Sequence, residues 1–121
     1  TGNKMPTINI NKNFKEAVKI MDKKKLGIVV VLKNKFIRGL VTDGDLRREL
    51  KYRSNFQNLN KVMTEKPMAV NENMPASKAL GIMNEKKITS LLVVADKDQN
   101  KKNKKLKGII HIHFLLRNGI N

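Results

Sequence analysis

The residues best suited to chemistry lie within GLVTDGDLRREL, residues 39–50, where polar and charged side chains follow an apolar run. Thr42 is a good N-cap for a helix, and Asp45, three residues later, has the spacing of the acidic partner in a capping box. The free amide groups and the dipole of a helix start also favour a bound phosphate, with Arg47 or Arg48 as charge partners. One threonine can cap the helix and also bind a ligand, so both interpretations stay open.

Acidic side chains occupy the first turn of this expected helix. Asp43 and Asp45 both suit the positive end of the helix dipole. Asp43 also lies four residues before Arg47, which is the spacing of a weak ion pair on a helix surface.

Two histidines, His111 and His113, are the other candidates for chemistry. Two residues apart in a strand, they would point to the same face, an arrangement that metal sites use. The chain contains no Cys, and no paired carboxylate lies near them in sequence, so we expect no metal site. No Ser/His/Asp order, P-loop or dinucleotide fingerprint can be assembled, and we therefore predict no catalytic residue.

The elements that must position these residues occur twice along the chain. Each copy has a short strand, an amphipathic helix, a buried apolar strand, a second strand and a final helix, which predicts two βαββα repeats and a mixed α/β (α+β) fold. Met83 stands 62 positions after Met21, and Ile88 stands 62 positions after Leu26. A half of this size could hardly bury a core alone, so we expect the two copies to pack against each other through one face of their sheets.

The repeat also sets the expected boundaries. We assign residues 1–54 to the first copy, 55–63 to a linker that ends in a short helical turn, and 64–121 to the second copy. Gly108 stands 69 positions after Gly39, so the second copy carries seven extra residues in a basic loop, 96–107. We expect that loop to be a mobile hairpin tip.

The amino-acid composition bears on whether this chain binds nucleic acids or membranes. The formal charge is +16, but only five of the 26 basic residues are Arg, and there is one Tyr and no Trp. Guanidinium groups and aromatic stacking platforms are thus scarce, and we predict a solvated surface and no specific nucleic-acid binding. The apolar runs are too short to cross a membrane, and no signal peptide is visible, so we expect a cytoplasmic protein without membrane contact. The first residue is Thr1, so the chain can be a piece of a longer protein.

The segment 39–45 matches the most specific motif of the cystathionine β-synthase (CBS) domain, at Gly39, Leu40, Val41, Thr42 and Asp45. The whole repeat resembles this domain. This resemblance implies a pseudo-twofold pair that binds adenosyl or other nucleotide ligands in clefts between the copies. By analogy, Thr42 and Asp45 would hold ribose or phosphate. The supporting residues would be Asp43, Arg47 and Arg48, together with backbone groups of Thr7, Ile8, Gly27 and Ile28 beside the base.

The second copy departs from this motif. His111 stands where Thr42 does, and Phe114 stands where Asp45 does. A carboxylate for the ribose is missing there, so we predict at most one ordinary adenosine-like site per chain. His111 and His113 would line a candidate second cleft or a dimer contact.

Several segments, among them TDGDLRREL, KKITSLLVV and IIHIHFLLRNGI, also resemble the C-terminal CBS pair of bacterial D-arabinose 5-phosphate isomerases. That family carries an N-terminal sugar-isomerase (SIS) domain and makes the precursor of the lipopolysaccharide sugar Kdo. The resemblance implies a non-catalytic regulatory tail, separated here from its SIS domain, that requires no cofactor and senses AMP, ATP or CMP-Kdo. It also implies a homodimer of CBS pairs in a parent enzyme that is a tetramer. Two alternatives remain: an assembly module without a ligand, and the CBS pair of another enzyme of sugar metabolism.

Overall fold

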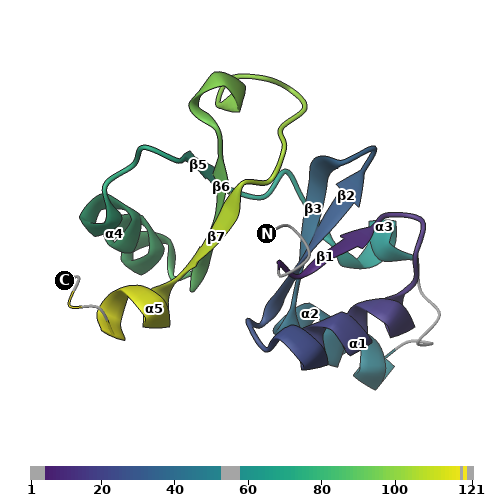
Figure 1. Cartoon of the computed structure of the whole chain (residues 1–121). Helices are drawn as coiled ribbons and strands as arrows, with labels where there is room; N and C mark the ends of the chain where they lie inside the picture. The colour runs from purple at the N-terminus through teal and green to yellow at the C-terminus, as the bar shows by residue number, and fades with distance from the viewer. Residues whose placement is uncertain (1–4, 53–57, 118, 120–121) are drawn as a thin grey trace. The chain divides into compact units, whose positions relative to one another are not determined.

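The computed structural model describes residues 5–52, 58–117 and 119, and the chain divides into two compact units, Thr1–Pro67 and Met68–Asn121 (Figure 1). Each unit combines a small sheet with helices, and the mixed α/β class predicted from the sequence is confirmed.

The first unit contains a four-stranded sheet in the order β1-β2-β3-β4. β1 pairs parallel with β2, while β2–β3 and β3–β4 are antiparallel. The elements are β1 (Thr7–Asn9), α1 (Phe14–Lys24), β2 (Ile28–Lys33), β3 (Phe36–Thr42), α2 (Asp43–Tyr52), α3 (Leu59–Val62) and β4 (Thr64–Glu65).

The second unit repeats this plan with a three-stranded sheet in the order β5-β6-β7. β5 is parallel to β6, and β6 is antiparallel to β7. The elements are β5 (Ala69–Asn71), α4 (Ala76–Lys86), β6 (Ser90–Val94), the 3₁₀ turn η2 (Asp96–Asp98), β7 (Gly108–His111) and α5 (Ile112–Arg117).

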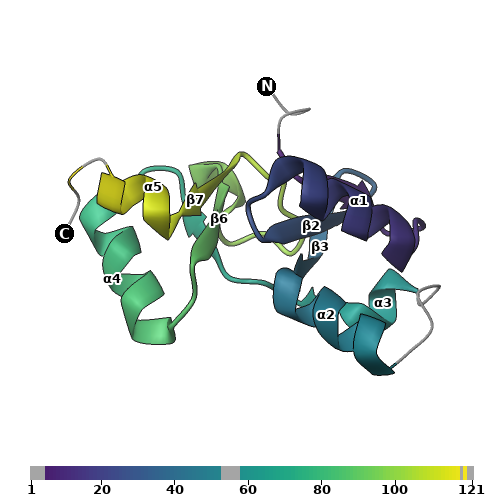
Figure 2. The same ribbon diagram turned by 90° about the horizontal axis from the view of Figure 1, so that it is seen from below.

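Helix α1 forms because its apolar residues recur on one face and its ends are capped. The Asn13 side chain accepts from the amide of Glu16 at 3.0 Å, and Lys25 closes the helix in the left-handed conformation. Phe14, Ala17 and Met21 are buried from this helix against the sheet. Figure 2 shows α1 and α2 beside the strands of the same unit.

Strand β2 is buried on both faces, as its continuous apolar run predicts. Val29 and Val31 belong to the core cluster under the helices, while Ile28 and Val30 on the other face are also buried. The second helix pattern holds as well, since Ala79, Leu80 and Met83 are buried from α4.

The predicted linker has two parts. Residues 55–57 lie outside the described residues, whereas the remainder contains the short helix α3. Leu59 at the start of α3 is fully buried and belongs to the core of the first unit. This part of the segment therefore packs with the first copy.

The basic loop 96–107 is folded around one carboxylate. Asp98 is buried, accepts from the Lys105 amide at 3.3 Å and pairs with the Lys101 ammonium at 3.4 Å. The Lys105 amide is the main cause that lowers the pKa of Asp98, with Lys101 and Lys97 adding to it. Asp98 thus fixes the course of the extra residues that the second copy carries.

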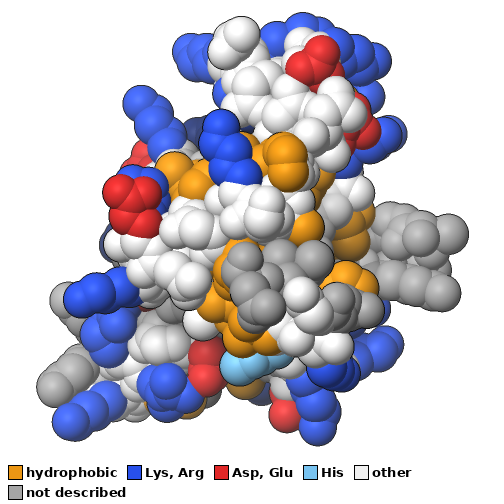
Figure 3. All heavy atoms as spheres, turned by 90° about the vertical axis from the view of Figure 1, so that its left-hand side faces the viewer, with side chains coloured by type: hydrophobic (Ala, Val, Ile, Leu, Met, Phe, Trp, Pro, Cys, Tyr) orange, Lys and Arg blue, Asp and Glu red, His pale blue; other side chains and the backbone are white. Residues whose placement is uncertain are grey.

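Positive charge is spread over the surface. No Lys among the described residues is buried. In Figure 3 blue Lys and Arg side chains lie around the rim of the face shown, with orange apolar side chains nearer its middle. Within the part of the chain that the structure describes, no helix has the length and apolar character needed to cross a bilayer.

Candidate ligand site

The joint between β3 and α2 places the motif at one end of the first sheet. Thr42, the last residue of β3, pairs with Ile28, the first residue of β2. The Asp43 amide donates to the carbonyl of Gly27 at 2.9 Å. Gly27 has a φ of +77°, which favours glycine, so the turn into β2 brings its carbonyl to the helix start. Four predicted site residues therefore meet at this joint: Thr42, Asp43, Gly27 and Ile28.

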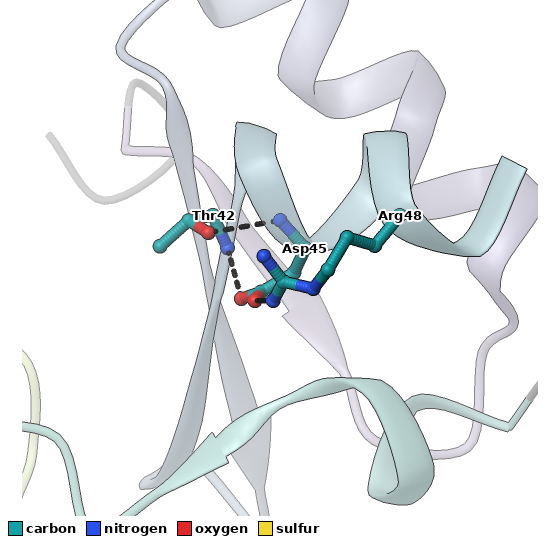
Figure 4. A network of polar contacts seen from close by, with 3 residues as sticks. All are labelled: Thr42, Asp45 and Arg48. Carbon is teal, nitrogen blue, oxygen red and sulfur yellow. Dashed lines mark hydrogen bonds and ion pairs between the residues drawn. The ribbon is translucent and has the colours of Figure 1, made fainter. Parts of the chain in front are cut away.

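Thr42 and Asp45 form a reciprocal capping box, drawn in Figure 4. The Thr42 hydroxyl accepts from the Asp45 amide at 3.1 Å, and Asp45 Oδ2 accepts from the Thr42 amide at 2.9 Å. The capping box predicted from residue type and spacing is confirmed. Asp45 is only 8% exposed, so its carboxylate depends on these partners to offset its burial.

The second oxygen of that carboxylate is also bonded. Arg48 Nη2 donates to Asp45 Oδ1, three residues earlier on the helix (Figure 4). The Arg48 side chain is 66% exposed while the Asp45 side chain is 11% exposed. A mobile cation therefore lies on a fixed, largely buried anion.

Asp43 and Arg47 lie on the other side of α2. Arg47 Nη1 donates to Asp43 Oδ2, and both side chains are exposed. This pair borders a hollow of about 400 Å³ between α1 and α2. Residues 43 and 47 share one helix face, while 45 and 48 share another. The structure thus divides the predicted ligand residues of α2 into two groups.

The lining of this hollow is apolar at its base and charged at its edge. Its residues are Val18, Met21, Asp22, Lys25, Gly27, Asp43, Leu46, Arg47 and Leu50. This hollow was not predicted from the sequence. The i, i+4 spacing of Leu46 and Leu50 was the signal that could have indicated an apolar strip on this face of α2. In the structure Leu50 is 59% exposed although it is apolar.

The two residues predicted on β1 lie further from the motif. Thr7 pairs with Val30 and Ile8 with Val31, so both are displaced along β2 from the Ile28 position that faces Thr42. The Ile8 side chain is buried in the core. At Ile8 only the backbone is available to a ligand, whereas Thr7 is half-buried.

The second unit has a different helix start. His111 Nδ1 accepts from the His113 amide at 3.2 Å, and the two rings lie 5.0 Å apart. Burial lowers the pKa of His111, and the charges of His113 and Arg117 lower it further. Phe114, at the position of Asp45, is 58% exposed. No carboxylate takes its place in this turn.

Ser90 is a further difference of the second unit. It pairs with His111 across β6 and β7, and its buried hydroxyl has no hydrogen-bond partner among the described residues. Among the residues that the structure describes, no group of three or more His, Cys, Asp or Glu side chains is suited to hold a metal ion.

Comparison with known proteins agrees with the repeat. A profile of the CBS domain matches residues 3–52 and 59–117. The arabinose 5-phosphate isomerase KdsD of Yersinia pestis is 36% identical over 123 residues, covering 99% of this chain and 35% of the isomerase. The chain spans about a third of the length of the curated relatives it matches.

Solved structures share the fold. A CBS domain protein from Pyrobaculum aerophilum, complexed with AMP, aligns with a TM-score of 0.79 at 18% identity, covering 92% of this chain and 82% of that one. The CBS domain pair of protein MJ0100, in complex with 5′-methylthioadenosine and S-adenosyl-L-methionine, aligns with a TM-score of 0.79 at 21% identity, covering 93% and 86%. The sequence repeat, the fold of each unit and the profile agree, and this chain belongs to the CBS domain family as a tandem pair homologous to the C-terminal region of KdsD isomerases.

Proposed function

We propose that this CBS pair senses a nucleotide or nucleotide sugar for a sugar-phosphate isomerase and binds it at the Thr42–Asp45 joint. The observation that carries the proposal is the position of Asp45, a largely buried carboxylate at a helix start beside the amides of β2 and β3. A carboxylate is an acceptor-only group and suits the hydroxyls of a ribose. The start of α2 suits a phosphate.

Relatives support the choice of ligand class and of parent enzyme. Structures of the same fold hold AMP in one protein and S-adenosyl-L-methionine in another. The homologous KdsD proteins are arabinose 5-phosphate isomerases, so the attached activity would be aldose–ketose isomerisation by a SIS domain. We place that enzyme in cytoplasmic Kdo and lipopolysaccharide synthesis, with AMP, ATP or the nucleotide sugar CMP-Kdo as regulatory ligand and no required cofactor.

Regulation would follow from a difference in affinity. A ligand that binds one arrangement of the CBS pair better than another shifts the protein toward the preferred arrangement. The attached catalytic domain would respond to that shift, and the two sites would be linked reciprocally. Of the two equivalent helix starts in the described residues, those of α2 and α5, only that of α2 carries carboxylates, so we expect one ordinary nucleotide per chain.

Thermal denaturation with added ligand tests the proposal. AMP, ATP and CMP-Kdo are each titrated against the wild type, Asp45→Asn and the matched control Asp43→Asn. A ligand at about 100 times its Kd should stabilise the wild type by roughly 2.7 kcal/mol. Asp45→Asn should lose the response, and Asp43→Asn should keep it because Asp43 is exposed on the other face of α2.

Two results would contradict nucleotide sensing at this joint. One is a wild type whose unfolding temperature does not change with any of the three ligands. The other is an Asp45→Asn variant that responds as strongly as the wild type.

A second candidate function is assembly of the parent enzyme without a ligand. The hollow between α1 and α2 favours it, because exposed Leu50 borders an apolar base whose edge carries both signs of charge. Two copies facing each other across a twofold axis could place Asp22 and Asp43 of one copy against Lys25 and Arg47 of the other. A homodimer of CBS pairs, within a tetrameric parent enzyme, would follow.

A further inference from the structure

Each oxygen of the Asp45 carboxylate accepts a hydrogen bond within α2 and its start. Oδ2 accepts from the Thr42 amide, and Oδ1 accepts from Arg48. The Thr42 amide belongs to the end of β3 and is fixed by the sheet. The Arg48 side chain is 66% exposed and is free to rotate into solvent. A ribose hydroxyl that approaches Oδ1 from the side that Arg48 occupies displaces Arg48.

The position of Arg48 has an electrostatic consequence. The guanidinium group is held at the N-terminal turn of α2, where the helix dipole disfavours a cation, and Asp45 is the partner that holds it there. Once displaced, the same group remains within reach of a phosphate bound at the helix start. Guanidinium–phosphate pairs are strong, charge-assisted contacts.

We propose that Arg48 sets the selectivity of this site for phosphate-bearing nucleotides over uncharged nucleosides. An uncharged nucleoside breaks the Arg48–Asp45 pair and offers no anion in return. A nucleoside monophosphate breaks the same pair and supplies a new partner for the guanidinium. This inference rests on the proposed function, and it attributes the ligand preference of the site to Arg48.

Arg38 provides the matched comparison. It has the same side chain and is exposed on β3, outside the predicted ligand residues. Arg47 is not suitable, because it is itself a predicted charge partner of the phosphate and pairs with Asp43 at the start of α2. Substitution of Arg38 changes the net charge of the chain by the same amount as substitution of Arg48.

Isothermal titration of the whole chain with AMP and with adenosine tests the proposal. We expect the wild type to bind AMP at least about tenfold more tightly than adenosine, the size of one charge-assisted contact. Arg48→Gln should bind AMP several-fold more weakly and adenosine several-fold more tightly, so the ratio falls by about tenfold or more. Arg48→Lys, which keeps the charge and loses the planar fork of the guanidinium group, should lie between them, and Arg38→Gln should keep the wild-type ratio.

The possible results separate the two proposals. If the wild type binds AMP and the AMP-to-adenosine ratio is unchanged in Arg48→Gln and Arg48→Lys, the selectivity role of Arg48 is wrong and nucleotide sensing stands. The same holds if both ligands bind Arg48→Gln more tightly by equal factors, since Arg48 then only competes for Asp45. If neither ligand binds the wild type, the selectivity role of Arg48 fails, and nucleotide sensing fails with it only if ATP and CMP-Kdo also leave the unfolding temperature unchanged.

Discussion

At the residue scale, Asp45 offers the same oxygens to partners of different kinds. They accept from the Thr42 amide and from Arg48, and they are the acceptors that a ribose would use. Residue type and spacing were enough to predict the Thr42–Asp45 box, since both hydrogen bonds are local. The i, i+4 spacing indicated a pair of Arg47 with Asp43, but the partner of Arg48 was not predicted. Arg48 pairs with Asp45 at i, i+3 spacing, and both spacings allow an ion pair on a helix.

His111 is a residue whose charge should affect stability near neutral pH. Its folded pKa lies below the unfolded value of about 6.5, chiefly because of burial. The unfolded chain therefore binds the proton more readily, and stability is full above about pH 6.5 and falls as the pH drops through that value toward the folded pKa. We expect the urea midpoint of the second unit to decrease between pH 8 and pH 5.

His111→Asn is the variant that checks this pH dependence. Asn can still accept from the amide of residue 113 but does not titrate, so the decrease should be much smaller. His113→Asn should retain most of it, because burial of His111 is the larger cause. An unchanged decrease in His111→Asn would assign the titration to another group.

At the element scale, the site depends on close packing along β3. Gly39 in β3 pairs with Glu65 of β4, and a Cβ atom added to it would lie 2.8 Å from Met63 Cγ and 3.0 Å from the Thr64 carbonyl oxygen. The motif glycine therefore allows β4 and the end of α3 to approach the strand that carries Thr42. At the corresponding Gly108 the nearest atom, Val93 Cβ, is 3.9 Å away.

Gly39→Ala should destabilise the first unit by about 1–3 kcal/mol, the usual cost of overpacking. Gly108→Ala should cost much less, because its new methyl group makes only an ordinary contact with Val93. Chemical denaturation of both variants measures the difference. Equal losses would indicate that the contact with Met63 and Thr64 relaxes freely.

Much at this scale could be predicted, and the exceptions have physical reasons. The 62-residue repeat predicted the positions of helices α1 and α4 and of the buried strands β2 and β6. Each of these elements depends on a local apolar pattern. β4 was not expected, because Thr64 and Glu65 carry no strand pattern and become a strand only by pairing with β3. The hollow between α1 and α2 depends on how closely two helices approach, which no local pattern specifies.

At the scale of the whole molecule, the net charge opposes association of identical copies. Each chain carries +16, so two chains repel each other at low ionic strength. Salt shortens the range of that repulsion, with a Debye length of about 8 Å at physiological ionic strength. If the α1–α2 hollow joins two copies, we expect self-association to strengthen as salt increases.

Sedimentation velocity measures this self-association. Leu50→Glu, which puts a charge at the border of the hollow, should weaken the dimer by at least about tenfold. Lys15→Gln is the control, since it lowers the net charge by the same amount at an exposed position of α1 that does not line the hollow. A chain that stays monomeric at every salt concentration, or equal effects of both changes, would exclude the hollow as the dimer contact.

The pairing of β4 with β3 has a mechanical consequence. Residues 66–68 are all that separates β4 from β5, so the chain leaves the first unit directly from a strand that is hydrogen-bonded to β3. Gly39 and Leu40, which hold β4, precede Thr42 by only three and two residues on the same strand. If a ligand bound at Thr42 shifts β3 along its axis, β4 must either move with it or lose its hydrogen bonds to β3. A shift of β4 would then act directly on residues 66–68, which lead into the second unit.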